Sequence, residues 1–141
     1  MPRHLTTTVH HLVGLRFVAE TPEGQRVMID NEKHARTGPS PMQLLLGATA
    51  ACAAMDIVNM LGKRKLTINS YRIEMTGERP DATPAPFEHI VARHVFDVPG
   101  LDEATAQRFV QLATEKYCSV GFSLKASIEY QVELEAAQPP A

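Results

Sequence analysis

Cysteine is scarce in this sequence of 141 residues and occurs only at Cys52 and Cys118. Two cysteines are too few for the disulfide framework of a small secreted domain, and a standing disulfide is not expected in a reducing compartment. The two thiols are therefore either inert and buried or a redox pair. On the residues alone, inert burial is the more common state of free cysteine.

The sequence also lacks an excess of charge of either sign. It has 14 Lys and Arg against 16 Asp and Glu, which gives a net charge of −2. A broad basic surface for nucleic acid or for an anionic membrane would need many more cations than acids. We therefore expect neither nucleic acid nor membrane among its partners.

Long hydrophobic runs and a signal segment are absent as well. The longest uncharged apolar run, residues 44–55, is too short to span a bilayer, and Asp56 ends it. The first residues, MPRHLTTTVHH, hold no apolar segment typical of a signal peptide. The sequence therefore predicts a cytoplasmic protein.

Several common catalytic patterns are missing. There is no glycine-rich phosphate loop and no Gly-x-Ser-x-Gly motif. Of the six histidines, the adjacent pair His10 and His11 points to opposite faces of a strand, and so do His89 and His94. These positions are poorly suited to chelate one ion, so we expect no metal and no cofactor.

The most distinctive stretch that is present, residues 40–65, reads SPMQLLLGATAACAAMDIVNMLGKRK and predicts a long helix. Ser40 suits the N-cap, Pro41 the first helical position, and Gln43 can complete a capping box. Gly62 is the expected stop. Small residues surround Cys52 over positions 47–54. They allow either close packing of the helix against a neighbour or room for a substrate beside a thiol.

The rest of the chain predicts strands and one more helix. Strands are expected over residues 6–20 with a break near Gly14, and over 25–30, 66–77, 88–98 and 126–134; a second helix is expected over 102–116. Strands grouped in hairpins with few helices favour an α+β fold with a mostly antiparallel sheet. We expect one domain over residues 1–141, with a frayed tail over 135–141.

The two thiols differ in their local surroundings. Cys52 lies mid-helix, far from the helix N-terminus, and no cation stands at helical spacing from it. Cys118 falls where the second helix ends, ahead of a short helical turn expected at Val120. A thiol near a helix N-terminus is favoured as a thiolate, so Cys118 has the better local surroundings for a reactive thiol. The alternative is a half-buried cysteine at a helix end with no chemical role.

These motifs together resemble the OsmC/Ohr superfamily, and its YhfA-like branch most closely. The residues that carry the resemblance are residues 40–46, Ala50-Ala51-Cys52, residues 55–58 and residues 115–120, within a match over about residues 8–134. The resemblance implies a tightly intertwined homodimer, in which each subunit contributes a long central helix buried between antiparallel sheets.

The resemblance also implies a chemistry. Members of this superfamily reduce organic hydroperoxides, which would make Cys52 the peroxidatic thiol that becomes a sulfenic acid and Cys118 the thiol that resolves it as a disulfide. The two Cα atoms would then lie within disulfide reach, about 4.4 to 6.8 Å apart. A dithiol reductant, in some members a lipoylated protein, would restore both thiols.

Two charged groups of the superfamily pattern bear on activation of the thiol. Active members carry a Glu near the start of the central helix, where this chain has Met42 and Gln43. They also carry an Arg that pairs with the thiolate. The candidates here are Arg16, Arg26 and Arg36, of which Arg36 is nearest in sequence to the helix.

The missing Glu leaves two other functions open. One is an OsmC-like dimer that binds an apolar or thiol-reactive small molecule without catalysis. The other is a purely structural dimer with inert thiols.

Overall fold

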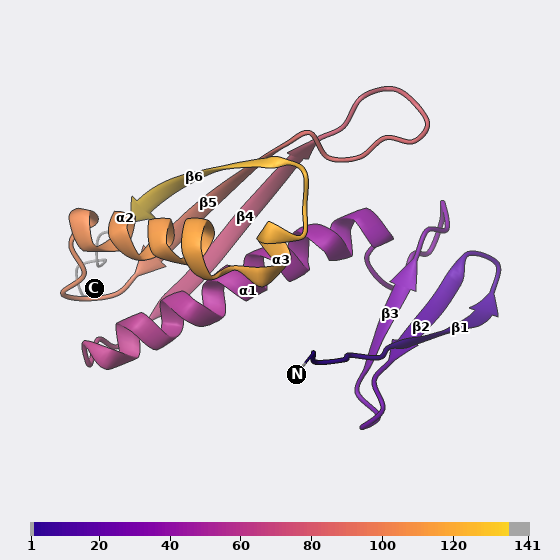
Figure 1. Ribbon diagram of the computed structural model, residues 1–141, viewed down its shortest axis with the longest axis horizontal. Helices are drawn as coiled ribbons and strands as arrows, with labels where there is room; N and C mark the ends of the chain where they lie inside the picture. Colours follow the sequence, from indigo (N-terminus) through magenta and orange to yellow (C-terminus); the bar gives the residue numbers. More distant parts are fainter. Residues whose placement is uncertain (1, 136–141) are drawn as a thin grey trace. The chain divides into compact units, whose positions relative to one another are not determined.

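The computed structural model describes residues 2–135 of the chain. These residues form two compact units, of which one ends at Leu45 and the other begins at Leu46, and each is described by itself (Figure 1). The expectation of a single domain stays a prediction.

The first unit is a three-stranded antiparallel sheet. Its strands are β1 (Thr8–Val13), β2 (Arg16–Glu20) and β3 (Arg26–Asp30), paired in the order β1-β2-β3. Gly14 turns the chain between β1 and β2 with a φ of 57°, a conformation that glycine adopts without a steric penalty. The expected break, placed between residues 10 and 14, is confirmed, and the strand expected over residues 25–30 does pair with the end of the one expected over 6–20.

Helix α1 (Pro41–Lys63) carries Cys52 and begins with the expected capping box. The backbone N–H of Gln43 donates to Ser40 Oγ at 3.2 Å, and the backbone N–H of Ser40 donates to Gln43 Oε1 at 3.0 Å. The helix continues through Gly62, contrary to the predicted stop there. The chain leaves the helical path at Lys65, whose φ is 57°.

The second unit contains a sheet of three strands in the order β4-β5-β6. These are β4 (Ser70–Glu78), β5 (His89–Asp97) and β6 (Ser127–Leu134). β4 and β5 pair antiparallel, but β5 and β6 pair parallel. A parallel pair needs a crossover connection, and the helical segments between β5 and β6 supply it. The expectation of an α+β fold is confirmed, with one parallel pair beside the antiparallel ones.

The second predicted helix is interrupted. α2 (Glu103–Leu112) starts at the N-cap Asp102 and is followed by one π-helical turn, Ala113–Tyr117, and by α3 (Ser119–Phe122). The backbone N–H of Cys118 donates to the carbonyl of Ala113 at 2.9 Å, which closes the wide turn. The sequence predicted a regular helix to residue 116 because side-chain periodicity does not reveal a single π turn.

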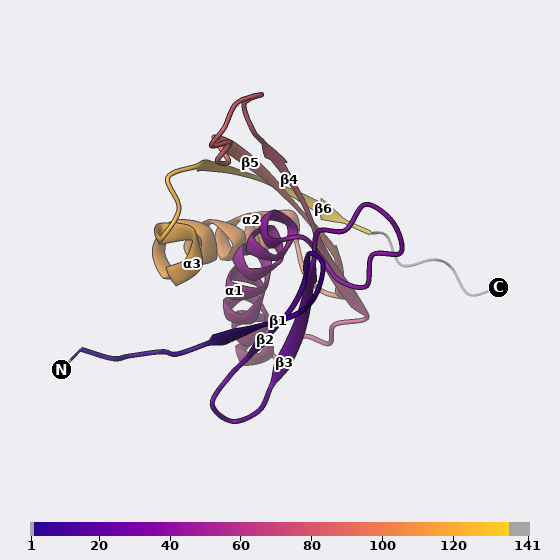
Figure 2. The ribbon, with the colours of Figure 1, turned by 90° about the vertical axis from the view of Figure 1, so that its right-hand side faces the viewer.

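The helices of the second unit cover one face of its sheet (Figure 2). The alternation of β5 turns Ile90, Ala92, His94 and Phe96 toward the helices, where they are buried. The opposite face carries ion pairs, among them Arg93 between Glu74 and Glu133. After β6, the N–H of Glu135 donates to the carbonyl of Phe96 at 2.7 Å, so this first residue of the expected frayed tail is held. The rest of that tail lies outside the described residues.

α1 is buried along one stripe only. Thr49, Ala53, Ile57 and Leu61 are buried, whereas Met55 and Val58 are 68% and 42% exposed. The sequence predicted a helix buried between sheets, and within one chain that burial is partial. By length and composition this helix could also cross a membrane, a test that the core helix of a soluble protein passes as well.

Candidate functional site

Cys118 is held inside the second unit by the segment after α2. It is 2% exposed, and its thiol donates a long hydrogen bond of 3.7 Å to the carbonyl of Thr49 on α1. Its Sγ accepts a hydrogen bond of 3.2 Å from the backbone N–H of Gly121. The π turn therefore directs Cys118 toward the middle of α1.

The position of Cys118 before α3 was expected to favour its thiolate, and this expectation was wrong. Burial is the main cause that raises the pKa of the Cys118 thiol above its ordinary value. The hydrogen bond from Gly121 opposes the rise, and the neighbouring Cys52 side chain adds to it. A helix of four residues offers too little to offset the loss of water around the sulfur.

Cys52 lies beside Cys118. Thr49 and Cys52 are three residues apart on α1, so they share a face of that helix, and Cys118 is anchored on Thr49. Cys52 packs against the core cluster that contains Cys118, and its side chain lies near enough to raise the pKa of the Cys118 thiol. Both thiols are free, and Cys52 is half-buried. The fold thus brings together the two thiols that the sequence singled out.

A small cavity adjoins the Cys118 thiol. About 10 Å³ of it is open to the centre of a water-sized molecule, which is about the space one water needs. Its walls come from α1, the sheet and the π turn, and are mainly apolar: Thr49, Ala50, Ala53, Ile73, Met75, Ala92, His94, Thr114, Cys118 and Ile128. The cavity therefore gives the thiol a small and mainly apolar neighbourhood.

His94 is the polar residue of this cavity that the sequence did not identify as a functional candidate. It is 1% exposed, and its Nδ1 shares a hydrogen bond of 2.7 Å with the hydroxyl of Tyr71. Burial lowers the pKa of His94 from 6.5 to about 4 and raises the pKa of Tyr71. The alternation of β5 did place His94 opposite His89, as predicted, but only the fold shows that its face carries Cys118.

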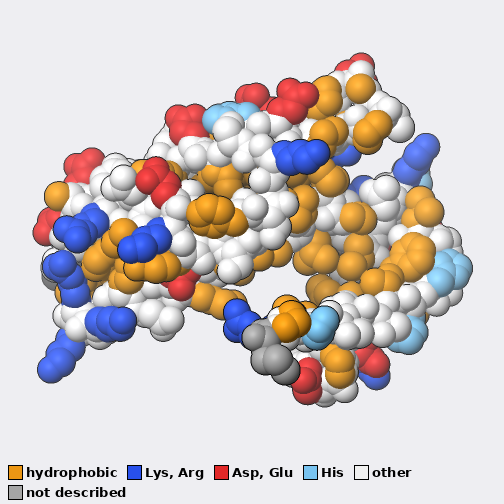
Figure 3. Space-filling model, viewed as in Figure 1, with side chains coloured by type: hydrophobic (Ala, Val, Ile, Leu, Met, Phe, Trp, Pro, Cys, Tyr) orange, Lys and Arg blue, Asp and Glu red, His pale blue; other side chains and the backbone are white. Residues whose placement is uncertain are grey.

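A second, open cleft of about 620 Å³ lies between α1 and α2. Figure 3 shows Lys and Arg side chains gathered around hydrophobic ones at this end of the molecule. The cations in its wall are Lys63, Arg64 and Arg108, and Arg64 lies 5.3 Å from the centre of the Phe109 ring. Asp56 is the acid in the same wall.

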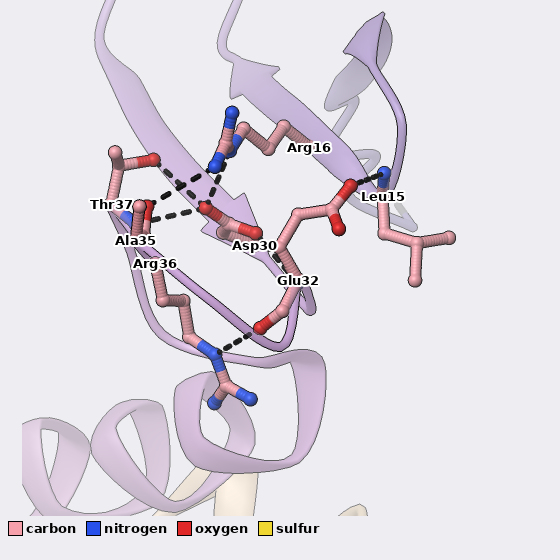
Figure 4. Close-up of polar contacts among 7 residues, drawn as sticks. All are labelled: Leu15, Arg16, Asp30, Glu32, Ala35, Arg36 and Thr37. Atoms are coloured by element: carbon pink, nitrogen blue, oxygen red, sulfur yellow. Dashed lines mark hydrogen bonds and ion pairs between the residues drawn. The ribbon is translucent and has the colours of Figure 1, made fainter.

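Arg16 and Arg26, two of the three candidate arginines, form ion pairs inside the first unit. Arg16 Nε lies 3.0 Å from Asp30 Oδ2, and Arg26 Nε lies 2.5 Å from Glu20 Oε2. Asp30 is fully buried at the centre of the contacts in Figure 4. Burial on its own raises the pKa of Asp30, but hydrogen bonds from Thr37, from the N–H of Glu32 and from Arg16 outweigh it and hold the pKa well below its usual range.

Arg36 differs from the other two because its hydrogen bonds, within residues 2–135, go to uncharged acceptors. Its Nε donates to the carbonyl of Glu32 at 3.1 Å, and its Nη1 lies 3.5 Å from Gln43 Oε1. No ion pair within the described part of the chain neutralises it. Arg36 is thus a cation at the start of the helix that carries Cys52.

The described residues hold no group of three or more His, Cys, Asp or Glu that could bind a metal ion. What the site offers is a pair of neighbouring thiols, one half-buried and one buried, beside a cavity with a neutral imidazole in its wall. An α+β protein with such a pair is suited to dithiol and disulfide chemistry.

Comparisons with known proteins place the chain in a family with this α+β fold. Residues 32–133 match the family model described as OsmC-like protein. The chain is 32% identical over 126 residues to protein YhfA of Escherichia coli strain K12, a match that covers 88% of this chain and 93% of YhfA. The chain belongs to the OsmC family.

Solved structures show the same fold. An OsmC-like protein from Mycoplasma pneumoniae superimposes with a TM-score of 0.79 at 20% identity, over 95% of this chain and 99% of that one. The organic hydroperoxide resistance protein OhrB of Bacillus subtilis superimposes with a TM-score of 0.58 at 22% identity, over 92% and 98% of the two chains. The resemblance seen in the sequence is confirmed at the level of the family and its fold.

Proposed function

We propose that this protein is a thiol peroxidase that reduces organic hydroperoxides with Cys52 and Cys118. The observation that carries the proposal is the contact between the two free thiols, one half-buried on α1 and the other buried beside it. The name of the B. subtilis structural relative, an organic hydroperoxide resistance protein, supports the choice of substrate.

The exposures of the two thiols match two different roles. Cys52 is half-buried and can meet a peroxide, so its sulfur attacks the O–O bond, becomes a sulfenic acid and releases the alcohol. Cys118 is 2% exposed and has a raised pKa, so it is protected from the peroxide and available to the sulfenic acid next to it. The resulting disulfide is reduced by a dithiol, for which a lipoylated protein is the candidate.

The cation that stabilises the Cys52 thiolate must come from outside the helical turn that carries Cys52. Arg36 is the strongest of the three candidates, because Arg16 and Arg26 are already paired with carboxylates. Met42 and Gln43 stand near where the resemblance places an acid in active members, and the Gln43 side chain completes the capping box and contacts Arg36. Arg36 therefore stays the candidate for stabilising the Cys52 thiolate, either of its own chain or of the second copy in the dimer.

The protein is further proposed to act in the cytoplasm as a homodimer. Ala48, Ala51, Met55 and Val58 form an exposed stripe of small and apolar residues on α1. Their spacing of three and four residues places them on one face of the helix. A second copy of the chain would cover that face and complete the burial that the sequence predicted.

The experiment that tests this function compares wild type with Cys52→Ser and Cys118→Ser. Each protein is given cumene hydroperoxide and a dithiol, and peroxide consumption is followed. Wild type should turn over, and Cys52→Ser should lose turnover. Without the dithiol, Cys118→Ser should consume about one equivalent of peroxide and accumulate a sulfenic acid. Full activity of Cys52→Ser would overturn the assignment of the peroxidatic thiol.

A non-catalytic binding function has one observation in its favour, the cleft between α1 and α2. Its wall joins Met60, Phe109 and Tyr117 to three cations, a combination suited to a ligand with an apolar body and an anionic group. This function would be the correct one if wild type bound such a ligand but failed to consume organic peroxide with a dithiol.

A further inference from the structure

Disulfide formation requires the Cys118 thiol to lose its proton in surroundings that disfavour the thiolate. Burial raises the pKa of Cys118, and the Cys52 side chain raises it further. At 2% exposure, Cys118 is also shielded from bulk water that could carry the proton away. The proton must therefore pass to a group inside the second unit.

The cavity beside Cys118 contains one such group. Apart from Cys118 itself, His94 is the side chain among the described lining residues that has a nitrogen lone pair able to accept a proton. The other described residues of the wall are apolar or are threonines, and no carboxylate, lysine or arginine is among them. The cavity has about the space that one water molecule needs, and a water there could bridge the Cys118 thiol and the His94 imidazole.

His94 is fixed in place for this task. It stands on β5 between Ala92 and Phe96 on the helix-facing side, and its ring stacks on Tyr71 with centroids 5.9 Å apart. When Nδ1–H donates to the Tyr71 oxygen, Nε2 carries the lone pair and can accept a proton. In that tautomer the imidazole can act as a base at Nε2.

We infer that His94 takes the proton of the Cys118 thiol during disulfide formation, through one water molecule in the cavity, and returns it to the leaving hydroxide. This inference rests on the proposed peroxidase function. The Cys118 sulfur forms the S–S bond as the S–O bond of the Cys52 sulfenic acid breaks. Hydroxide leaves with the electron pair of that bond and becomes water with the returned proton, so the imidazole ends neutral. The oxidant is the hydroperoxide that formed the sulfenic acid.

The titratable groups around His94 make its effect visible in a pH profile. They are Tyr71 on β4, Cys118 after the π turn, and Cys52 on α1 beside Cys118. Burial keeps His94 neutral down to about pH 4, so it is a base throughout the neutral range. With His94 present, the rate at which Cys118 converts the Cys52 sulfenic acid to the disulfide should depend only weakly on pH between 6 and 8. Without it, the rate should follow the small fraction of Cys118 thiolate and rise about tenfold per pH unit.

The test compares His94→Gln with His89→Gln. His89 is the matched control because it stands on the same strand, on the opposite face, bonded to Ser127 and Glu129. After one equivalent of cumene hydroperoxide, sulfenic acid at Cys52 is trapped with dimedone and disulfide is measured by mass spectrometry over time. His94→Gln should form the sulfenic acid at the wild-type rate but resolve it at least about tenfold more slowly at pH 7, with the steep pH profile. His89→Gln should match wild type.

A second measurement avoids peroxide. An aromatic disulfide reagent is coupled to Cys52, and release of its coloured thiolate reports attack by Cys118. Slower release with a steeper pH profile in His94→Gln supports the inference. The inference is overturned if His94→Gln releases the thiolate at the wild-type rate, or if its rate is lower by the same factor at every pH. His94 would then have a structural role only. Absence of both sulfenic acid and disulfide in wild type would overturn the proposed function, whereas a normal first step with unchanged resolution in His94→Gln would overturn this inference alone. If His94→Gln does not fold, His94→Asn is read by the same criteria.

Discussion

At the scale of single residues, the two thiols are distinguished by their surroundings more than by their sequence context. Cys52 looked inert because no cation stands near it on the helix, and Cys118 looked reactive because a helical turn follows it. In the folded chain Cys118 is the buried thiol with the raised pKa. Local sequence could not reveal this, because the burial comes from α1 and from a sheet formed by other parts of the chain.

Arg36 gives the first prediction at this scale. Because Arg36 makes no ion pair with a described carboxylate, Arg36→Gln should remove the charge that stabilises the Cys52 thiolate and slow sulfenic acid formation about tenfold or more at pH 7. The rate is measured in a single turnover with excess cumene hydroperoxide. Arg26→Gln, whose arginine is paired with Glu20, is the control and should react like wild type. Equal rates for all three proteins would remove Arg36 from the site.

His94 gives a second prediction, on stability. Its pKa is about 4 in the folded protein and about 6.5 when unfolded, so the unfolded chain binds more protons between these values and stability is lost as pH falls through them. The free energy of unfolding should drop by about 2 kcal/mol between pH 7 and pH 5 from this group alone. Urea denaturation at both pH values measures it. His94→Gln should lose that part of the pH dependence and His89→Gln should retain it; a full pH dependence in His94→Gln would contradict the assignment.

At the scale of elements, the sequence predicted what depends on local rules. The capping box of Ser40 and Gln43 was readable because capping needs only residues a few positions apart. The turn at Gly14 could be predicted for the same reason. The sequence did not predict the π turn of Ala113–Tyr117 or the parallel pairing of β5 with β6. The parallel pairing joins segments that are distant in the sequence, and a single π turn leaves no mark in the periodicity of side chains. The π turn is the element that turns Cys118 into the core.

The capping box gives a prediction at this scale. Ser40→Ala removes the side-chain acceptor for the backbone N–H of Gln43, and the free energy of unfolding should fall by about 1 kcal/mol. Ser70→Ala, at an exposed serine where β4 begins, should change it by much less. Thermal and urea denaturation measure both variants. A Ser40→Ala protein as stable as wild type would show that the box adds nothing to α1.

At the scale of the whole molecule, one chain leaves an apolar stripe of α1 uncovered. Met55 and Val58 are exposed on the helix that the sequence predicted to be buried. The family resemblance predicts an intertwined dimer that would cover this stripe, which periodicity within one chain could not have predicted. Family membership and the dithiol were thus predictable from the sequence, whereas the cavity and the partner of His94 required the fold.

The stripe predicts the oligomeric state. Wild type should sediment as a dimer in analytical ultracentrifugation at micromolar concentration. Met55→Glu places a charge in the proposed interface, where burial without a partner is costly, and should shift the protein to monomer. Thr76→Glu, on the exposed face of the second sheet, is the control and should stay dimeric. A monomeric wild type would contradict the proposed assembly.

The central claim, that Cys52 and Cys118 work as a pair, is tested most directly by mass spectrometry of the protein after one equivalent of cumene hydroperoxide. The account predicts that the intact mass falls by two hydrogens and that proteolysis yields one cross-linked pair of peptides, joining Cys52 to Cys118. An unchanged mass, or oxygen retained on Cys52 with Cys118 still a free thiol, would contradict it.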